Sequence, residues 1–311
     1  MNAIEIENLV KRFDDFVAVD HLNLSIRQGE LISLLGPNGA GKSTTIRILT
    51  TLLPPSEGTI TIAGHRVPEG NERIKPLLGL VPQEIALYDT LSARRNLNFF
   101  AGLYGLQGAA RDSRVNELLD SVELSDRADD RVTNFSGGMQ RRVNIAAALV
   151  HDPEIIFMDE PTVGLDPVSR SAIWSVIEKL KQRGKTILLT THYMEEAEAL
   201  CDRVAIVDHG KTIAVGTPAE LIEETGIQTV LNISVVGPAE TCLDEIRALE
   251  GVEQVVVDED SLRIYTSAGS RLLPQVIQAL MTGGADVRAA EVTEPNLGAV
   301  YLHYTGRELR D

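Results

Sequence analysis

The residues with the clearest chemistry form a glycine-rich segment near the start of the chain. Residues 36–43 read Gly-Pro-Asn-Gly-Ala-Gly-Lys-Ser and fit the pattern G-x-x-x-x-G-K-S/T. Glycines let backbone N–H groups wrap closely around phosphate oxygens, and the helical pattern that follows points its positive end at the same anion. Lys42 would place a charge on the β- and γ-phosphates, and Ser43 would offer a hydroxyl to Mg²⁺. The segment therefore predicts a nucleoside triphosphate site rather than an ordinary glycine-rich turn.

Two carboxylates suit the hydrolysis of such a nucleotide. The apolar run 155–158 reads Ile-Ile-Phe-Met and ends directly in Asp159-Glu160. Open α/β sheets bind their ligands at the carboxyl ends of the strands, where this pair would lie. Asp159 suits a contact with Mg²⁺ through water, and Glu160 suits polarising the attacking water as a general base. An acidic pair alone often only begins a loop, so this interpretation depends on the other motifs.

Elements of an α/β fold would hold these groups in place. Residues 1–220 alternate strand-like apolar runs with helical patterns, which is typical of an α/β sheet. The run 31–35 precedes the glycine-rich segment, and a third apolar run, 186–191, lies farther along the chain. Residues 85–134 contain mostly helical patterns, so we expect a helical subdomain there.

A second domain is expected from residue 226 to residue 311. Its patterns follow the order strand, helix, strand, strand, helix, strand, which is that of a ferredoxin-like α+β fold. The acidic run 258–260 is interpreted as the turn between the two middle strands rather than as a metal site. A tail at 295–311 includes a possible short helix.

The composition excludes several classes of protein. The chain has 311 residues and a formal net charge of −16, which argues against nucleic acid as a partner, since phosphate neutralisation needs basic patches. No apolar run reaches the roughly 18 residues that a membrane span needs, and the first residues lack the features of a signal peptide. Cys201 and Cys242 have no metal-binding spacing and are expected to be small buried side chains in a reducing compartment.

Further motifs accompany the phosphate loop. Residues 136–138 read Ser-Gly-Gly and open a helix, Gln83 follows a strand-like run, Asp166 lies soon after Glu160, and His192 closes the run 186–191. In this order and spacing, residues 1–220 resemble the ATP-binding subunit of an ABC transporter. The resemblance implies a P-loop NTPase fold, in which a RecA-like α/β core carries a helical subdomain.

The resemblance also implies a role for each matching residue. Glu160 matches the catalytic glutamate, His192 the switch histidine, and Gln83 the Q-loop residue that touches the metal and senses the membrane partner. Asp159 and Ser43 match the other two residues at the metal. The matches that would bind ATP are Phe13 for stacking on adenine, with Phe16 as a weaker candidate, the Walker A residues Gly36, Pro37, Asn38, Gly39, Ala40, Gly41, Lys42, Ser43 and Thr44, the signature residues Ser136, Gly137 and Gly138, and the D-loop residue Asp166.

The resemblance further implies cofactors and partners. ATP and Mg²⁺ would bind between two copies of the chain, because the signature of one copy contacts the γ-phosphate held by the Walker A loop of the other. A separate transmembrane permease would dock on the helical region, with Tyr88, Leu91 and Phe99 as candidate groove residues. The protein would then act at the cytoplasmic face of the cell membrane.

Departures from the commonest signature indicate a branch of the family. Phe135 replaces the usual leucine and Met139 the usual glutamine of Leu-Ser-Gly-Gly-Gln. The Ser-Gly-Gly-Met form and the ending at 301–309 resemble the daunorubicin-resistance and nodulation exporters. We therefore expect an ATPase that powers efflux of a drug- or lipid-like substrate. An importer ATPase with a regulatory C-terminal domain and a soluble ABC ATPase without a transport role are the alternatives.

The C-terminal domain shows no catalytic constellation, and two interpretations remain for it. It would either brace the ATPase dimer between turnovers or bind a regulatory ligand. The brace is favoured because residues 226–311 offer no cluster of polar groups suited to a pocket.

Overall fold

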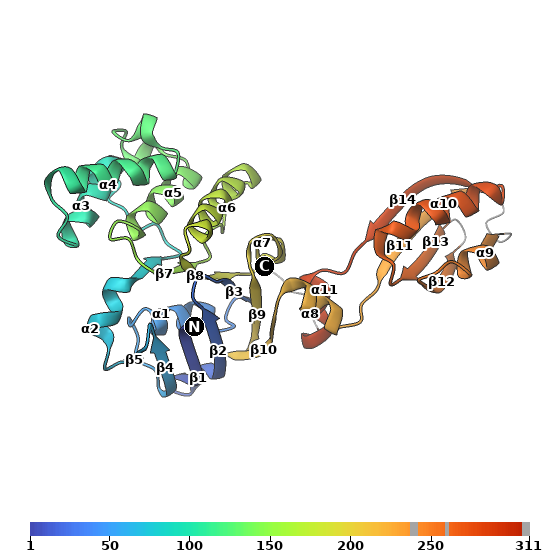
Figure 1. Ribbon diagram of the computed structural model, residues 1–311, viewed down its shortest axis with the longest axis horizontal. Coiled ribbons are helices and arrows are strands. Elements are labelled where there is room, and N and C mark those ends of the chain that lie inside the picture. Colours follow the sequence, from blue (N-terminus) through green and yellow to red (C-terminus); the bar gives the residue numbers. More distant parts are fainter. Residues whose placement is uncertain (237–241, 259–260, 307–311) are drawn as a thin grey trace. The chain divides into compact units, whose positions relative to one another are not determined.

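The computed structural model describes residues 1–236, 242–258 and 261–306. It separates into two compact units, Met1–Pro218 and a second unit that begins at Ala219 (Figure 1). Helix α8 (Pro218–Glu224), which the sequence places around the expected boundary, therefore groups with the second unit. Within the described ranges, the helices are too short or too polar to span a lipid bilayer.

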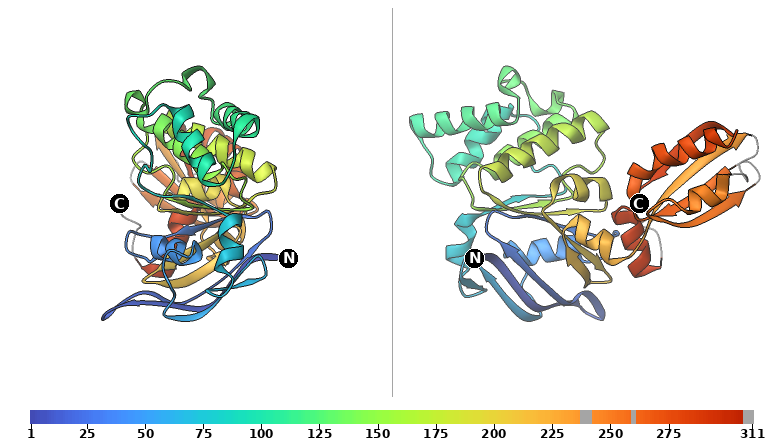
Figure 2. Two further views of the ribbon diagram at one scale, coloured as in Figure 1. Left: turned by 90° about the vertical axis from the view of Figure 1, so that its left-hand side faces the viewer. Right: turned by 45° about the vertical axis from the view of Figure 1, so that its right-hand side comes forward.

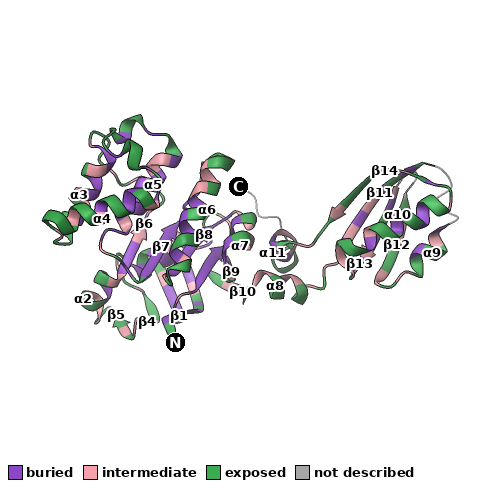
Figure 3. Ribbon diagram, turned by 45° about the horizontal axis from the view of Figure 1, so that its top comes forward, coloured by how far each residue is buried: buried purple, intermediate pink, exposed green. Residues whose placement is uncertain are grey.

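A six-stranded, mostly parallel sheet forms the centre of the first unit. Its strand order is β10-β9-β3-β8-β7-β6, and only β10 runs antiparallel to its neighbour. Every residue of β3, β7 and β8 is buried, and Figure 3 shows β7 and β8 in purple. Strands covered on both faces have continuous apolar sequences, which explains the three apolar runs. The strands are β3 (Leu31–Leu35), β6 (Leu78–Val81), β7 (Ile155–Asp159), β8 (Thr186–Thr191), β9 (Arg203–Asp208) and β10 (Lys211–Gly216).

A second, antiparallel sheet of order β2-β1-β4-β5 shares a core with the central one. Ile4 and Ile26 from this sheet, Ile46 from helix α1, and Ile32 and Phe157 from the central sheet all belong to one buried apolar cluster. The helix that follows the phosphate loop is thus fixed by apolar packing. The elements are β1 (Asn2–Phe13), β2 (Phe16–Arg27), α1 (Lys42–Leu49), β4 (Glu57–Ile62) and β5 (His65–Val67).

Helices form a separate layer of the first unit, at the top of both views in Figure 2. The expected helical region 85–134 holds α3 and α4, and α5 packs against both of them although it begins after that region. Helix α1 and two shorter helices lie elsewhere in the unit. The helices are α2 (Asn71–Ile74), α3 (Ala93–Leu103), α4 (Gly108–Ser121), α5 (Gly137–Ala148), α6 (Pro167–Gln182) and α7 (Met194–Leu200).

The second unit contains an antiparallel sheet of order β12-β13-β11-β14. Leu231 and Ile264 of this sheet pack with Ile246 of α9 and Leu280 of α10 in one apolar core. The strand and helix order matches the predicted ferredoxin-like pattern, and the fold class is confirmed for both units. Of the predicted turn 258–260, residues 259–260 lie outside the described residues, as does the end of the tail at 307–311. The elements are β11 (Thr229–Val236), α9 (Leu243–Arg247), β12 (Val252–Asp258), β13 (Ser261–Thr266), α10 (Leu273–Thr282), β14 (Asp286–Thr293) and α11 (Leu297–Thr305).

Candidate active site

The loop between β3 and α1 requires glycine at two positions for steric reasons. A Cβ atom at Gly36 would lie 2.1 Å from the carbonyl oxygen of Val207. Gly41 has a φ of +95°, and a Cβ there would lie 2.4 Å from the carbonyl oxygen of Ala18. A side chain at either position would force the backbone apart. The glycine pattern therefore reflects close backbone packing under the loop as well as room for phosphate above it.

Lys42 lies beneath this loop and is 4% exposed. Its Nζ donates hydrogen bonds to the carbonyl oxygens of Gly36 at 2.7 Å and Pro37 at 3.0 Å. The same atom is 3.3 Å from Oε1 of Glu160. Burial lowers the pKa of the Lys42 ammonium, and the Glu160 carboxylate opposes that shift. The loop thus holds a preorganised cation whose existing partners are all oxygen atoms.

Asp159 is fixed by two hydroxyl groups. Ser43 Oγ donates to Asp159 Oδ1 at 2.9 Å, and Thr190 Oγ1 donates to the same oxygen at 2.6 Å. Asp159 and Thr190 are direct neighbours in register on the parallel strands β7 and β8. The sequence analysis missed Thr190, although a hydroxyl near the carboxyl end of an otherwise apolar strand was a usable signal.

Three of the predicted site residues lie around the side chain of Glu160. Its carboxylate is 6% exposed and lies near three side chains: Lys42, His192 with Nδ1 3.5 Å from Oε1, and Gln83, which donates from Nε2 to Oε2 at 3.3 Å. The backbone N–H of Glu160 donates to Thr190 Oγ1 at 3.0 Å. Its φ is +46°, a left-handed conformation that is costly for a side chain such as glutamate and is found disproportionately at functional sites.

A cavity of about 460 Å³ opens above these groups. It brings together residues of the phosphate loop, Gln83, Glu160 and His192, which lie far apart in the sequence. The lining residues are Phe16, Ala18, Asn38, Gly39, Gly41, Lys42, Ser43, Thr44, Gln83, Glu160, Val163 and His192.

The lining favours Phe16 over Phe13, contrary to the preference in the sequence analysis. The two residues face each other across the turn between β1 and β2. Phe16 lines the cavity, whereas Phe13 is not among the described lining residues and has the ammonium of Lys11 5.0 Å from its ring centre. Phe16 is therefore the better placed of the two to contact a base next to the loop.

The predicted signature residues lie outside this cavity. Ser136 caps helix α5, where its Oγ accepts a hydrogen bond from the N–H of Met139 at 3.3 Å. Gly138 approaches helix α6 so closely that a Cβ would lie 2.4 Å from Ser169 Oγ. Asp166 caps α6 by accepting hydrogen bonds from the N–H groups of Val168 and Ser169, and the Ser169 hydroxyl lowers its pKa. These groups are ordered but are not part of the described lining of the cavity.

Arg141 is a second residue that the sequence analysis missed. It is 4% exposed and donates from Nη1 to the carbonyl oxygen of Pro82 at 2.8 Å and from Nη2 to that of Gln83 at 2.6 Å. Burial lowers the pKa of its guanidinium, but an arginine remains charged. Helix α5, which begins at the signature, is thereby fastened to the segment that carries Gln83.

Comparisons with known proteins show which family the chain belongs to. The family model for ABC transporters matches residues 19–163. The chain is 42% identical over 310 residues to the linearmycin resistance ATP-binding protein of Bacillus subtilis, covering 99% of this chain and 100% of that protein. It is 41% identical to the Nod factor export ATP-binding protein I of Sinorhizobium fredii, covering 99% and 88% of the two chains. It is 39% identical to a daunorubicin resistance ATP-binding protein of Streptomyces coeruleorubidus, covering 99% and 97%.

Solved structures resemble the first unit. The dimeric structure of a bacterial ABC transporter cassette is 30% identical, with a TM-score of 0.62, and the match covers 69% of this chain and 98% of that one. A structure of cbiO1 from Clostridium perfringens, part of an ABC transporter complex, has a TM-score of 0.67 at 29% identity and covers 72% and 91%. The chain therefore belongs to the ABC transporter family, and it is an ATP-binding and ATP-hydrolysing protein of that family.

Proposed function

We propose that this ATPase powers the export of a drug- or lipid-like substrate through a separate membrane permease. The names of the linearmycin-resistance, daunorubicin-resistance and Nod factor export relatives support export, and each alignment covers 99% of the chain. The observation that supports its energy source, ATP hydrolysis, is the convergence of Lys42, Gln83 and His192 on the carboxylate of Glu160 beside the phosphate loop. The protein would work at the cytoplasmic face of the membrane that holds the permease.

In the proposed reaction, the loop and Lys42 bind the phosphate chain of ATP. A γ-phosphate would compete with Glu160 for the Lys42 ammonium, which is 3.3 Å from the carboxylate. The released carboxylate of Glu160 then accepts a proton from the attacking water as the water oxygen bonds to the γ-phosphorus, and the bond between that phosphorus and the ADP oxygen breaks to release ADP. Gln83 and His192 hold the Glu160 carboxylate in place. His192 would donate a hydrogen bond to the γ-phosphate and so respond to its loss.

Ser43 and Asp159 fit a role in holding Mg²⁺. Both present hard oxygen donors, and their side chains already meet at 2.9 Å. Among the described residues there is no group of three or more His, Cys, Asp or Glu side chains that would hold a metal alone. This suits an ion that arrives with the nucleotide, since Mg²⁺ usually binds through one or two carboxylates together with substrate phosphates. Bound there, Mg²⁺ would neutralise charge on the phosphates.

A second copy of the chain would complete the site. The signature residues 136–138 and Asp166 lie outside the described lining of the cavity, so one chain does not bring them to its own nucleotide. The N-terminus of α5 offers N–H groups suited to an anion. The dimeric state of a similar cassette supports a head-to-tail pair with ATP at the interface.

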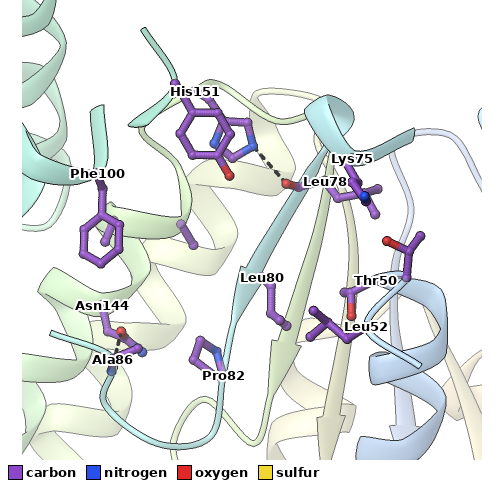
Figure 4. A pocket seen from close by; sticks show the side chains of 14 residues that line it. Thr50, Leu52, Lys75, Leu78, Leu80, Pro82, Ala86, Phe100, Asn144 and His151 are labelled. Carbon is purple, nitrogen blue, oxygen red and sulfur yellow. Dashed lines mark hydrogen bonds between the residues drawn. The ribbon is translucent and has the colours of Figure 1, made fainter. Parts of the chain in front are cut away.

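A cavity of about 570 Å³ in the first unit is the proposed permease dock (Figure 4). Leu52, Leu80 and Phe100 give it an apolar wall, and its lining includes Pro82, next to Gln83. An apolar segment of a membrane partner would suit such a lining and would touch the loop that reaches Glu160. The remaining lining residues are Thr50, Thr51, Lys75, Leu78, Ala86, Tyr104, Asn144, Ala147, Ala148 and His151.

The candidate groove residues named from the sequence differ from the residues that line this cavity. Tyr88, Leu91 and Phe99 are not among the described lining residues, and Tyr88 instead packs edge-to-face on Phe99 at 4.9 Å. Tyr104 stacks flat on His151 at 3.9 Å, and His151 Nε2 lies 2.8 Å from the carbonyl oxygen of Leu78. Burial lowers the pKa of the His151 imidazole, and its hydrogen bond with the Leu78 carbonyl oxygen opposes that shift.

The export proposal is tested in cells that lack the gene. Accumulation of labelled drug-like and lipid-like compounds should rise in the deletion strain and return to normal with the wild-type gene. The Glu160→Gln variant should not restore efflux, because transport would lack its energy source. Loss of uptake of a compound, with efflux unchanged, would instead favour an importer.

Adenine stacking is tested by removing each aromatic ring in turn. Phe16→Ala should weaken ATP binding by roughly 5- to 150-fold, since stacking a base on an aromatic ring contributes about 1–3 kcal/mol. Phe13→Ala should change the Kd for ATP less than about twofold by the same reasoning. Binding of inorganic tripolyphosphate, which has no base, serves as the control and should be equal in both variants. A larger effect of Phe13→Ala would restore the assignment made from the sequence.

A further inference from the structure

One buried carboxylate of the first unit takes no part in the proposed reaction. Glu196 lies on helix α7 and is 0% exposed. Its Oε1 accepts hydrogen bonds from Thr162 Oγ1 at 2.8 Å and from Trp174 Nε1 at 3.0 Å. Burial raises the pKa of this carboxyl group. Removing a carboxyl group from water costs free energy unless hydrogen bonds compensate for it. The two hydrogen bonds to Glu196 therefore indicate a role for this buried group.

The two donors flank Asp166. Thr162 lies in the loop between Glu160 and Asp166, and it is 1% exposed. Trp174 lies on helix α6, whose N-terminus is capped by Asp166 through the N–H groups of Val168 and Ser169. One oxygen of Glu196 therefore holds the segment before Asp166 and the helix after it.

The same region connects to the switch histidine. His192 and Tyr193 directly precede α7, and their rings pack with centres 4.2 Å apart. The guanidinium carbon of Arg170, on α6, lies 4.5 Å from the centre of the Tyr193 ring. The segment of His192 thus contacts α6 at two points, through Tyr193 with Arg170 and through Glu196 with Trp174.

We infer that Glu196 is a positioning residue that couples His192 to Asp166 by accepting hydrogen bonds from Thr162 and Trp174. The inference rests on the roles proposed above for His192 and Asp166. When His192 responds to the γ-phosphate, α7 carries Glu196 with it, and both segments next to Asp166 follow. Hydrogen bonding from the side chains of Thr191, Thr162 and Trp174 opposes the rise in the pKa of the Glu196 carboxyl group that burial causes.

Four variants of the full chain test this coupling by steady-state kinetics. Glu196→Leu removes the acceptor, Thr162→Val removes one donor at nearly constant shape, and Glu196→Gln keeps an oxygen in the same place. Glu195→Leu is the matched control, since Glu195 is the exposed neighbour on the same helix. Glu196→Leu and Thr162→Val should lower kcat about 5- to 100-fold and leave KM for ATP within about twofold, whereas Glu196→Gln should keep most of the activity.

Intrinsic fluorescence gives a second measurement. A purely structural role of Glu196 would not change how the emission responds to nucleotide. Trp174 is the only tryptophan of the chain, so its emission reports the environment of the indole that Glu196 contacts. Adding Mg-ATP to the wild-type protein and to Glu195→Leu should shift this emission. The shift should be lost in Glu196→Leu, retained in Glu196→Gln and reduced in Thr162→Val.

Several results would overturn the coupling. These are a folded Glu196→Leu variant with wild-type kcat, a Glu196→Gln variant as impaired as Glu196→Leu, or an unaltered fluorescence response in Glu196→Leu. If Glu196→Leu does not fold, the isosteric Thr162→Val variant decides, and wild-type kcat there would contradict the proposal. Failure of the roles proposed for His192 and Asp166 is distinguishable, because it would show as wild-type kcat in His192→Ala and Asp166→Ala, two variants that leave Glu196 in place.

Discussion

Replacing Glu160 with glutamine is expected to lower ATP turnover by at least about 100-fold, because a positioned general base contributes a factor of that order. An amide cannot accept the proton of the attacking water. Glutamine matches glutamate in size and adopts the left-handed φ of 46° at a similar cost, so the backbone should not move. Phosphate release under saturating Mg-ATP is the measurement, and normal turnover would remove Glu160 from its role.

ATP binding should survive in the same variant, or become tighter. In the free protein the Glu160 carboxylate competes for Lys42 at 3.3 Å, and the neutral amide no longer does so. Without hydrolysis, ATP-bound pairs should accumulate and appear in size-exclusion chromatography with light scattering. Mg-ADP is the nucleotide control, and Glu195→Gln is the control for loss of one acidic group elsewhere.

The oligomeric state of the Glu160→Gln variant also tests the role proposed for the second unit as a dimer brace. A shift from monomer to dimer on adding Mg-ATP would support the ATP-bridged pair. A dimer with and without nucleotide would instead favour the brace proposed for residues 226–311. A monomer under both conditions would contradict a pair held by nucleotide alone and would make the permease part of the assembly.

Lys42→Ala should weaken ATP binding itself, by about 10- to 150-fold. A hydrogen bond to a charged group contributes about 1.5–3 kcal/mol, and Lys42 is preorganised by two carbonyl oxygens of the loop. Equilibrium binding of a fluorescent ATP analogue is the measurement. Lys179→Ala removes an exposed cation from helix α6 and serves as the control. An unchanged Kd in Lys42→Ala would contradict the assignment of the phosphate loop.

A variant with both Lys42→Ala and Glu160→Gln separates the effect of Lys42 on ATP binding from its effect on stability. Lys42→Ala alone leaves the buried Glu160 carboxylate without its cation, which should lower the melting temperature. Lys42→Ala with Glu160→Gln removes both charges, so the melting temperature should recover in part while ATP binding stays weak. Recovery of binding together with stability would show that Lys42 acts on ATP only through the fold.

Local sequence patterns were enough to predict where the glycine-rich loop and the carboxylate pair lie in the fold. Both are contiguous segments at the ends of fully buried strands, and their backbone geometry is set by glycines and by strand burial. Thr190 was not predicted, because its bond to Asp159 joins two strands at a register that only the assembled sheet determines. Arg141 was missed for a similar reason, since its partners are backbone atoms of a distant loop.

The adenine-contact residue shows why side-chain direction is harder to predict. The pairing of β1 with β2 shifts register between Leu9 and Lys11 and again between Lys11 and Arg12. Phe13 and Phe16 are direct partners at the end of this pairing, so the irregularities do not separate the two rings, and the difference between them arises at the turn. The resemblance to the family suggested Phe13, whereas Phe16 is the one of the two that lines the cavity.

The hydrogen bonds of Arg141 have a consequence for how its contact with the Gln83 segment is detected in related sequences. Its guanidinium holds the carbonyl oxygens of residues 82 and 83, and every amino acid provides such an oxygen. A substitution at position 82 or 83 would therefore require no compensating substitution at Arg141. A search for correlated substitutions would overlook this link between the signature helix and the loop of Gln83, even though the two segments are fastened together.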